Sequence, residues 1–412
     1  MINLYIFNEI CRANVYGIGT YLKELTVALK KSDINVCVIN LYSKSPDMEI
    51  EEMDGIKHWY IPAPIYQPTT FDWYQMNNSY CHNIIYLLRL EIEDVTSLVF
   101  QLNYNQSSKL STELKNTFNC KIITTVHYLD WALLLFGNTS YFKQILTMPK
   151  SKYTSNIQKA TIESYKREKE LFETVDHIIC LSKNTQQILL EDYRISLDKT
   201  IVIYNGLTNK SIVSDKSMLN RKYFKPEIPT ILFVGRIDDS KGLKYTLRAF
   251  KTVLKTCPSC HLIIVGDGDW DSHIKECEEI WMRVTWTGLI SKEKLYDLYS
   301  IADIGILPSF HEQCSYVAIE MMMHSIPLIA SNSTGLQEMI KDKVTGLHIP
   351  IIEYNNTVEI DTNLLAEKII HLLKHPTEAK KLGMNAYKLY EERYSNEIFR
   401  ENMLNFYHSL SE

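Results

Sequence analysis

The chain has 412 residues, with 44 basic and 49 acidic side chains and a formal net charge of −5. At about 150 residues per domain, this length predicts two or three domains, each large enough to bury a core without disulfide or metal staples. The mildly acidic balance excludes a strongly basic surface for nucleic acid or membrane. A hydrophobic share of 45% and a charged share of 23% exclude global disorder.

Cysteine usage and the start of the chain bear on its compartment. Nine scattered cysteines, an odd number, are typical of free thiols in a reducing environment, so we expect a cytoplasmic protein. The first nine residues lack the basic n-region of a signal peptide, and we interpret them as containing a first strand. No apolar run approaches the roughly 18 residues of a membrane-spanning helix. We therefore expect at most a weak peripheral membrane contact.

Short apolar strands alternate with amphipathic helices through the first half of the chain. Strands are predicted at residues 3–7, 35–41, 97–101, 121–126, 177–181 and 200–204. After the first strand, a helix carries one apolar stripe, formed by Ile18, Leu22, Leu25 and Leu29. This alternation predicts a parallel sheet with both faces covered. Three stretches without a period are expected to be irregular insertions that form a substrate-specific surface: 62–75, 103–108 and 138–155.

The alternation stops and then restarts in the second half. Residues 209–229 are rich in Lys, Ser and Asn and end with two prolines, which predicts a linker. Beyond it, strands are predicted at 230–234, 261–265, 283–287, 303–307 and 327–330. Helices are predicted at 243–254, 272–280, 292–300, 315–323, 364–373, 378–391 and 397–410. We therefore predict two doubly wound domains, 1–208 and 230–393, and a final helical segment, 394–412.

Ligands of doubly wound sheets bind outside the carboxyl ends of the strands, where two acidic residues are found. Glu312 lies in a loop after a predicted strand, and Glu320 follows eight positions later inside a helix. Carboxylates accept hydrogen bonds from vicinal hydroxyls, so both suit polyol recognition. The backbone N–H groups of Ser315, Tyr316 and Val317 open the helix between them and could bind an anion. The alternative is a loop acid and a solvated helix acid.

Two further strand ends carry cations and glycines. Arg236 and Lys241 follow a predicted strand and could clamp a diphosphate; the alternative is a solvated loop whose charges cap a helix. Gly17 and Gly19 follow the first strand and would let the backbone approach a phosphate or sugar. The third glycine and the acidic residue of a dinucleotide-binding fingerprint are missing, so we expect no redox cofactor.

One histidine and one acidic turn remain as candidates. His127 lies at the carboxyl end of a predicted strand, where it could serve the site or be structural. Asp267 and Asp269 have a spacing that could hold Mg²⁺ or Mn²⁺. We favour a tight strand-to-helix turn there, because Arg236 and Lys241 already supply positive charge. No other histidine shows ligand spacing, so we predict no bound metal.

Several short motifs follow one another in a recognisable order: Gly235-Arg236 to Lys241-Gly242, Val265-Gly-Asp-Gly268, Thr287-Gly288, Ala302-Asp303 to Pro308-Ser309, the acids at 312 and 320, and Thr345-Gly346-Leu347. As a set they resemble the group 1 glycosyltransferases of the GT-B fold, the large retaining family four. Ser182 and Asn205-Gly206 match as well, and the resemblance is densest between residues 230 and 350. It implies two Rossmann-like domains with parallel sheets facing across a cleft. It also implies that the final helix packs back on the N-terminal, acceptor-side domain.

The resemblance implies a role for each matching residue. Glu312 would bind hydroxyls of the donor sugar, and Glu320 would bind the ribose hydroxyls. Arg236 and Lys241 would hold the diphosphate and stabilise its charge as it leaves. His127 would approach the donor sugar. The candidate catalytic residues are therefore Arg236, Lys241, His127 and Glu312.

The resemblance also implies contacts from the backbone around the nucleotide sugar. Gly17 and Gly19 would lie near the diphosphate, together with Gly266, and Leu289 and Ile290 would face the base. The implied donor is a nucleotide-diphosphate sugar, UDP-linked in our prediction, and it would be bound without metal or cofactor. The chain departs from the family where Gln313-Cys314-Ser315 replaces the usual Gly-Phe-Gly after the first acid. This departure leaves the donor sugar open.

The sequence therefore predicts a retaining glycosyltransferase that moves a sugar to an acceptor hydroxyl on a surface glycan, a lipid-linked glycan or a peptide. The peptide alternative comes from the opening segment, residues 5–21, which resembles a Bacteroidetes branch of the family. Nucleic acid is not an expected partner. Three alternatives stay open: a GT-B sugar-nucleotide epimerase, a non-catalytic GT-B partner protein, and a metal-dependent GT-A-type transferase that uses Asp267 and Asp269.

Overall fold

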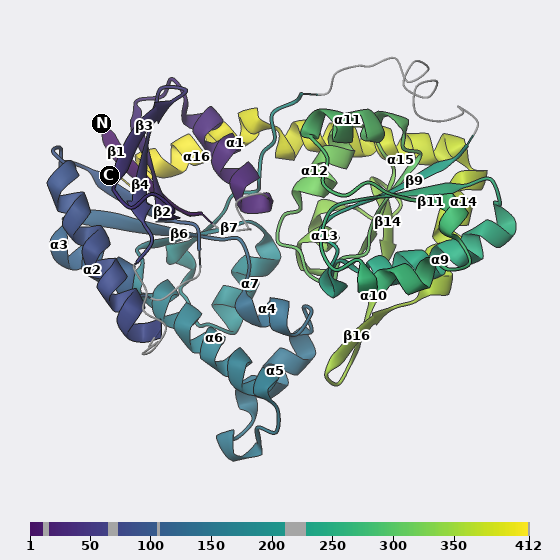
Figure 1. Ribbon diagram of the computed structural model, residues 1–412, viewed down its shortest axis with the longest axis horizontal. Coiled ribbons are helices and arrows are strands. Elements are labelled where there is room, and N and C mark those ends of the chain that lie inside the picture. The colour runs from purple at the N-terminus through teal and green to yellow at the C-terminus, as the bar shows by residue number, and fades with distance from the viewer. Residues whose placement is uncertain (11–15, 65–72, 105–107, 211–227, 411–412) are drawn as a thin grey trace. The chain divides into compact units, whose positions relative to one another are not determined.

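A computed structural model, drawn as a ribbon in Figure 1, describes residues 1–10, 16–64, 73–104, 108–210 and 228–410. The chain forms two compact units. The first comprises Met1–Trp131, Met148–Gly206 and Asn396–Glu412, and the second comprises Ala132–Thr147 and Leu207–Ser395. Each unit is built around a sheet of mainly parallel strands with helices between them. The predicted α/β class with two Rossmann-like folds is therefore confirmed.

The first unit contains an eight-stranded sheet. Its strands lie in the order β3 (Glu49–Met53), β4 (Ile56–Pro62), β2 (Ile34–Ser43), β1 (Ile2–Glu9), β5 (Leu98–Leu102), β6 (Cys120–Val126), β7 (His177–Cys180) and β8 (Thr200–Val202). Only β3 pairs antiparallel to its neighbour. Leu4 and Ile6 of β1 are fully buried, because helices cover both faces of a parallel sheet. The strand order reverses beside β1, and a ligand crevice is expected outside the carboxyl end at such a point.

Helices cover this sheet on both faces (Figure 1): α1 (Gly17–Leu29), α2 (Trp73–Glu91), α3 (Lys109–Thr117), α6 (Asn156–Thr174), α7 (Lys183–Glu191) and α16 (Asn396–Ser409). The C-terminal helix α16 packs against α1. Phe399 and Met403 bury its apolar face. At its start, Asn396 Nδ2 donates to the Glu24 carbonyl at 3.0 Å. The last helix of the chain thus belongs to the first unit.

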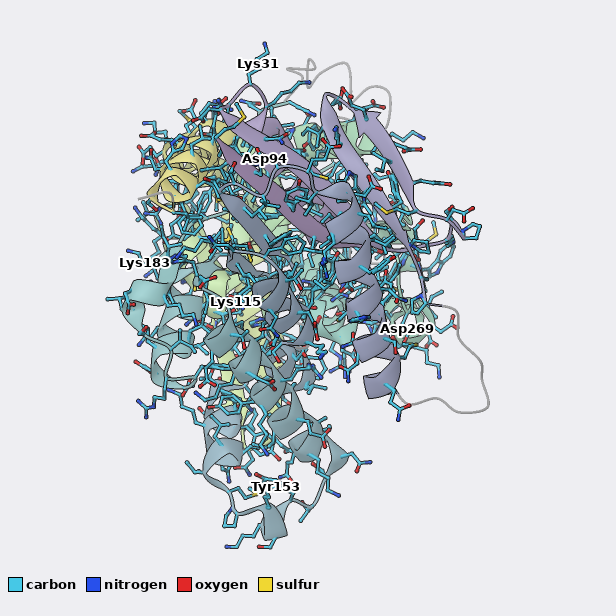
Figure 2. All side chains as sticks on the ribbon, turned by 90° about the vertical axis from the view of Figure 1, so that its left-hand side faces the viewer. Lys31, Asp94, Lys115, Tyr153, Lys183 and Asp269 are labelled. Carbon is cyan, nitrogen blue, oxygen red and sulfur yellow. The ribbon has the colours of Figure 1, made fainter. Side chains whose placement is uncertain are left out.

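The segment before α6 is more regular than its sequence suggests. Ser155 and Gln158 form a capping box, in which Ser155 Oγ accepts from the Gln158 N–H at 3.3 Å and Gln158 Oε1 accepts from the Ser155 N–H at 3.2 Å. Tyr153, just before this cap, and Lys31, just after α1, lie at opposite ends of the view in Figure 2. The prediction of an irregular insertion at 138–155 is wrong, because α5 (Thr139–Thr147) and the turn η3 (Lys150–Lys152) lie there.

The second unit contains a six-stranded, fully parallel sheet. Its order is β11 (Val284–Trp286), β10 (His261–Val265), β9 (Thr230–Val234), β12 (Ile304–Leu307), β13 (Leu328–Ser331) and β14 (Gly346–Ile349). The predicted strands 230–234 and 261–265 have the same bounds as β9 and β10. The order reverses between β9 and β12, so the loops after these strands again meet where a ligand is expected.

The helices of the second unit are α9 (Leu243–Thr256), α10 (Asp271–Ile274), α11 (Lys292–Ile301), α12 (Tyr316–Met323), α13 (Thr334–Met339), α14 (Thr362–Lys374) and α15 (Pro376–Leu389). Helices α9 and α14 pack together against one face of the sheet. The predicted helix at 272–280 is shorter than expected, because α10 is followed by a 3-10 turn, η6 (Lys275–Cys277). An antiparallel hairpin, β15 (Ile351–Tyr354) and β16 (Thr357–Ile360), was not predicted.

One segment of the chain lies in a different unit from the one predicted. Residues Ala132–Thr147, placed within 1–208 by sequence, belong to the second unit. There Asn138 Nδ2 donates to the Thr357 carbonyl oxygen at 3.2 Å, and the Thr139 N–H donates to Glu353 Oε1 at 3.1 Å. These polar contacts with the β15–β16 hairpin account for the assignment. The predicted linker, 209–229, lies almost entirely outside the described residues. No helix of the described chain is long and apolar enough to cross a membrane.

Candidate functional site

The loops after β9 and β12 meet at the carboxyl edge of the second sheet. Lys241 Nζ lies 2.6 Å from Glu312 Oε1, and both side chains are mostly buried. The approach depends on Gly242, whose φ is +69° and where a Cβ would lie 2.2 Å from the Pro308 carbonyl oxygen. Two residues 71 positions apart are thus held as an ion pair. This pair places a cation beside a carboxylate that can accept a hydrogen bond.

The loops after β9, β10 and β11 lie side by side at the same edge. The Ile237 N–H donates to the Asp267 carbonyl oxygen at 3.0 Å, and the Gly266 N–H donates to the Gly288 carbonyl oxygen at 3.2 Å. A Cβ at Gly266 would lie 1.8 Å from the Gly235 carbonyl oxygen, so only glycine allows this close packing. The predicted base-facing residues Leu289 and Ile290 follow Gly288 directly. The predicted nucleotide contacts of this unit therefore share one edge.

Arg236 lies in the same group of loops but is held less firmly than Lys241. Its guanidinium pairs with Asp238 Oδ2 at 3.2 Å, and 42% of its side chain is exposed. An exposed pair of this kind contributes little to stability, so the guanidinium can exchange partners at low cost. Arg236 is therefore available to an anionic ligand.

Glu320 is buried on α12, with 1% of its side chain exposed, and so is not a solvated helix acid. Its Oε1 accepts from Lys292 Nζ, and its Oε2 accepts from the Tyr299 hydroxyl at 2.8 Å. Burial, and then the negative charge of Glu320, raise the pKa of Tyr299 well above its usual value, so this hydroxyl stays protonated and donates. Each carboxylate oxygen has a second lone pair for a ligand hydroxyl.

The backbone between the two acids is fixed by α13. The Gly335 N–H donates to the Glu312 carbonyl oxygen at 2.7 Å, and Ser315 Oγ caps α12 by accepting from the Ala318 N–H at 3.4 Å. The Ser315 N–H, predicted to be part of an anion site, faces Met339 Sδ at 3.2 Å instead. The anion-site prediction therefore loses this donor, while Tyr316 and Val317 still begin the helix.

His127 lies at the carboxyl edge of the first sheet, immediately after β6. Its Nε2 lies 3.1 Å from Asn103 Oδ1, and its ring packs against that of Tyr21 in a T-shaped arrangement with a centroid distance of 4.6 Å. Burial lowers the pKa of His127 to about 3, so the ring is neutral at physiological pH. Tyr21 belongs to α1, whose first turn contains Gly17 and Gly19. The structure therefore brings the predicted histidine close to the predicted glycine-bearing turn.

A small cavity of about 40 Å³ lies in the first unit beside Asn103. Its wall combines aromatic and polar side chains, among them Phe7, Glu9, Tyr42, Asn77, Tyr80 and Tyr104. At this volume the cavity is far smaller than the pocket of a sugar or lipid ligand.

The acidic turn after β10 acts as a local cap. Asp267 Oδ1 accepts from Trp270 Nε1 at 3.5 Å, and Asp269 Oδ1 accepts from the Ser272 N–H at 3.4 Å. The favoured interpretation of this segment as a strand-to-helix turn matches these bonds. Across the described residues, one cluster offers three ligand atoms of a kind that metals use, and it lies where α14 meets α15: His371, His375 and Glu378. None of the three is a predicted site residue.

Sequence reasoning missed four residues that hold the predicted ones in place: Tyr21, Asn103, Lys292 and Tyr299. Asn103 directly follows β5, so the strand-end rule that selected His127 would have found it. Lys292 and Tyr299 reach Glu320 across 28 and 21 positions of the chain. No local pattern encodes those contacts.

Two family models match the chain. Residues 15–209 match the glycosyltransferase family 4 model, and residues 216–389 match that of the glycosyl transferases group 1. An uncharacterized glycosyltransferase of Methanocaldococcus jannaschii is 27% identical over 245 residues, which is 54% of this chain and 61% of that protein. The alpha-D-kanosaminyltransferase of Streptomyces kanamyceticus is 26% identical over 198 residues, 47% and 49% of the two chains. The chain thus spans about half to three-fifths of the length of these two relatives.

Solved structures show the fold over the full length. Sucrose-phosphate synthase from Thermosynechococcus elongatus superposes with a TM-score of 0.75 at 21% identity, covering 100% of this chain and 99% of that one. Anabaena HepE in complex with UDP-glucose superposes with a TM-score of 0.69 at 14% identity, covering 99% of this chain and 100% of that one. This likeness shows that the chain has the GT-B fold, and its two halves are similar to the glycosyltransferase family 4 model and to the model of the glycosyl transferases group 1.

Proposed function

We propose that the protein transfers a sugar from a nucleotide-diphosphate sugar to an acceptor hydroxyl. The observation that carries this proposal is the Lys241–Glu312 pair, 2.6 Å apart at the carboxyl edge of the second sheet. An ammonium recognises a diphosphate, and a carboxylate recognises vicinal sugar hydroxyls. A sugar diphosphate carries both groups next to each other, so one ligand engages both side chains.

The charge that develops in the reaction lies on the leaving diphosphate. As the bond between the anomeric carbon and the diphosphate oxygen breaks, that oxygen gains negative charge, which Lys241 and Arg236 stabilise. When the donor binds, Lys241 turns from Glu312 to the phosphate, and Glu312 accepts from the sugar hydroxyls. Each charge-assisted hydrogen bond contributes roughly 1.5–3 kcal/mol. Both partners of the ion pair thus exchange one charged contact for another.

Glu320 supplies the ribose contact. Its carboxylate is already oriented by Lys292 and Tyr299, so little conformational entropy is lost when the ribose hydroxyls donate to it. The Anabaena structures were determined with UDP, with UDP-glucose and with UDP and glucose, which supports a UDP-linked donor here as well.

We infer retention at the anomeric carbon and independence of metal. We assign Glu312 and Glu320 to hydroxyl recognition, which leaves no carboxylate among the site residues as the nucleophile of a double displacement. Retention, which the resemblance to the family implies, then requires the acceptor hydroxyl to attack from the face that the diphosphate leaves, with its proton passing to the leaving phosphate. Arg236 and Lys241 supply the positive charge that a metal would supply elsewhere.

The acceptor is a surface glycan, a lipid-linked glycan or a peptide. Relatives of this chain include a Salmonella typhimurium lipopolysaccharide 1,2-N-acetylglucosaminetransferase and a Streptococcus pneumoniae alpha-monoglucosyldiacylglycerol synthase. The names of these two proteins refer to a lipopolysaccharide and to a diacylglycerol, which supports a glycan or lipid acceptor here.

A donor screen tests the proposal. UDP-, GDP- and ADP-linked sugars are incubated with the protein in excess EDTA, and release of the nucleoside diphosphate is measured. We expect one base to be preferred, UDP above the others, and turnover to continue in the chelator. Release of no nucleoside diphosphate from any donor would contradict the transfer, and complete loss in EDTA would contradict metal independence.

A further inference from the structure

Three side chains of metal-binding types meet between the helices labelled α14 and α15 in Figure 1. His371 lies in the last turn of α14, His375 separates the two helices, and Glu378 lies in the first turn of α15. Their ligand atoms all lie within 4.8 Å of one another. The two histidines are four positions apart, a spacing that recurs in zinc sites on helices, and their ring centroids lie 4.4 Å apart. This spacing was overlooked in the sequence.

Hydrogen bonding fixes which nitrogen of His375 can bind a cation. Its Nδ1 lies 2.8 Å from the carbonyl oxygen of His371. Because a carbonyl oxygen can only accept, Nδ1 must carry a hydrogen, and in a neutral imidazole the other nitrogen, Nε2, then keeps its lone pair. Histidines that bind metals commonly donate their second N–H to a backbone carbonyl in this way, which fixes the direction of the ligand atom. His375 thus presents Nε2 as a ligand.

His371 and Glu378 provide the other two ligand atoms. His371 Nε2 lies 2.9 Å from Glu378 Oε2, so the imidazole donates to the carboxylate when no metal is bound. A metal ion takes the place of that hydrogen and binds both atoms. In a tetrahedral zinc site, bonds of about 2.0–2.2 Å separate the ligand atoms by roughly 3.3–3.6 Å. The separations in this cluster, 2.9 Å for one pair and no more than 4.8 Å for any pair, bracket this range, so small side-chain rotations are sufficient.

Solvent reaches the cluster, so an ion can enter and a water molecule can complete its coordination. The side chains of His371 and Glu378 are 46% and 45% exposed, and His375 is also exposed. Three protein ligands and one water make a tetrahedral zinc site. Two imidazole nitrogens and one carboxylate oxygen suit Zn²⁺ and its neighbours among the divalent transition metals, whereas Mg²⁺ and Ca²⁺ prefer oxygen ligands.

The cluster lies outside the loops of the candidate nucleotide-sugar site. Helix α15 packs against α12 and β14, and Asn385 Nδ2 donates to the Val344 carbonyl oxygen at 2.9 Å. Val344 lies in the loop that leads into β14, so α15 borders the amino edge of the second sheet. Lys241 and Glu312 lie in loops at its carboxyl edge. We therefore expect a metal between α14 and α15 to leave sugar transfer unchanged.

We propose that His371, His375 and Glu378 bind one Zn²⁺-type ion, which joins the end of α14 to the start of α15. His371 belongs to α14 and Glu378 to α15, so bonds from one ion to both side chains add a link between the two helices. An ion that binds the folded chain stabilises it against unfolding. The ion is a structural link and not a part of the transfer reaction.

Calorimetric titration of ZnCl₂ into the full chain, freed of metal with EDTA and kept reduced, tests the site. We expect one ion per chain, bound about tenfold or more weakly in His375→Ala and in Glu378→Gln. Both side chains are exposed, so each variant should fold. The matched control is His408→Ala, which removes an exposed histidine paired with Asp33 at 3.0 Å and should bind zinc like wild type. No zinc binding by wild type, or equal affinity in wild type and His375→Ala, would overturn the proposal.

Co²⁺ distinguishes this cluster from the free thiols of Cys257 and Cys260. Cobalt bound to thiolates absorbs strongly in the near ultraviolet, whereas cobalt bound to nitrogen and oxygen gives only weak visible bands. We expect weak bands alone, and we expect His375→Ala to lose them. A strong ultraviolet band that persists in His375→Ala would show that cysteines bind the ion, and would overturn the proposal.

Thermal unfolding tests the link between the helices. The Tm of wild type should rise with added ZnCl₂, because the ion binds only the folded arrangement, whereas the Tm of His375→Ala should not rise. An equal rise in both proteins would overturn the proposed link. No donor or acceptor enters these measurements, so a failure here leaves the proposed function intact.

Discussion

The two units contain candidate sites of opposite electrostatic character. In the second unit, Lys241 faces Glu312 at 2.6 Å, and Glu320 is held by Lys292, so the side chains work through full charges. In the first unit, His127 and Asn103 meet at 3.1 Å through neutral groups. Burial disfavours the charged form of the His127 imidazole by lowering its pKa, so the candidate site of the first unit is neutral.

The difference separates binding from discrimination. Charge-assisted hydrogen bonds are strong and form with any phosphate group, so the side chains of the second unit are suited to binding a diphosphate. Neutral hydrogen bonds are weaker, but a buried donor or acceptor left without its partner is costly, so they distinguish one hydroxyl pattern from another. We therefore expect substitutions in the second unit to weaken donor binding or to slow turnover, and those in the first unit to have less effect on the binding of the diphosphate.

The largest effect is expected for Lys241→Ala. It removes a cation that stabilises the leaving diphosphate and leaves Glu312 without its partner, and we expect kcat/KM for the donor to fall about 100-fold. The matched control is Lys251→Ala, which removes a weak exposed pair with Glu279 at 3.8 Å and should be near wild type. A Lys241→Ala enzyme within threefold of wild type would contradict the assignment of charge to this site.

A smaller loss is expected for Glu320→Gln. Glutamine can still accept from Tyr299 but carries no charge for Lys292 or for the ribose hydroxyls. Because the ribose bonds are alike in the ground state and the transition state, we expect a roughly 10-fold rise in KM with little change in kcat. Steady-state kinetics beside Glu293→Gln, an exposed acid of α11, provide the comparison. A fall in kcat with unchanged KM would place Glu320 in the chemical step instead.

The smallest effect concerns stability in the first unit. Glu168 is buried, its Oε1 accepts from the Asp130 N–H at 2.7 Å, and burial followed by the charge of Asp130 raises its pKa to about 8. The folded protein then retains a proton that the unfolded chain releases above its ordinary pKa of 4.5. The free energy of unfolding should therefore decrease as the pH rises from about 4.5 to 8.

Chemical denaturation at several pH values tests this expectation. The decrease should be smaller in Glu168→Gln, which cannot ionise, and should persist in Glu173→Gln, which changes an exposed acid on the same helix. An identical pH dependence in wild type and Glu168→Gln would show that Glu168 is ionised in the folded state. The first unit would then contain a buried charge, and the contrast with the second unit would weaken.

Much of the fold could be predicted because its strands are short apolar runs between amphipathic helices. The strands at 230–234 and 261–265 agree with β9 and β10 for this reason. Strand β3 escaped notice because every residue of Glu49–Met53 is exposed. Strand β4 was also missed, although it buries Ile56, Trp59 and Ile61. Helix α5 was missed because it buries only Phe142 and Ile145, too few positions to show a helical period.

The candidate site, too, could be predicted only in part. The ends of parallel strands must meet at one edge, so position alone selected Lys241, Glu312 and His127 as candidates. Which atoms touch could not be predicted, because Lys241 and Glu312 are separated by 71 positions and their contact depends on how Gly242 packs. Asn103 was placed in an irregular insertion, although it follows a strand end as directly as His127 does.

The central claim is that charged side chains of the second unit bind the diphosphate and that the neutral groups of the first unit do not. Its most direct test is a calorimetric measurement of nucleoside diphosphate affinity. The diphosphate of the preferred donor, UDP in our proposal, is titrated into wild type, Lys241→Ala and Asn103→Leu. The proposed division predicts at least tenfold weaker binding in Lys241→Ala and unchanged binding in Asn103→Leu, because the diphosphate is bound by charged groups of the second unit. Equal affinity in wild type and Lys241→Ala, or a loss confined to Asn103→Leu, would contradict it.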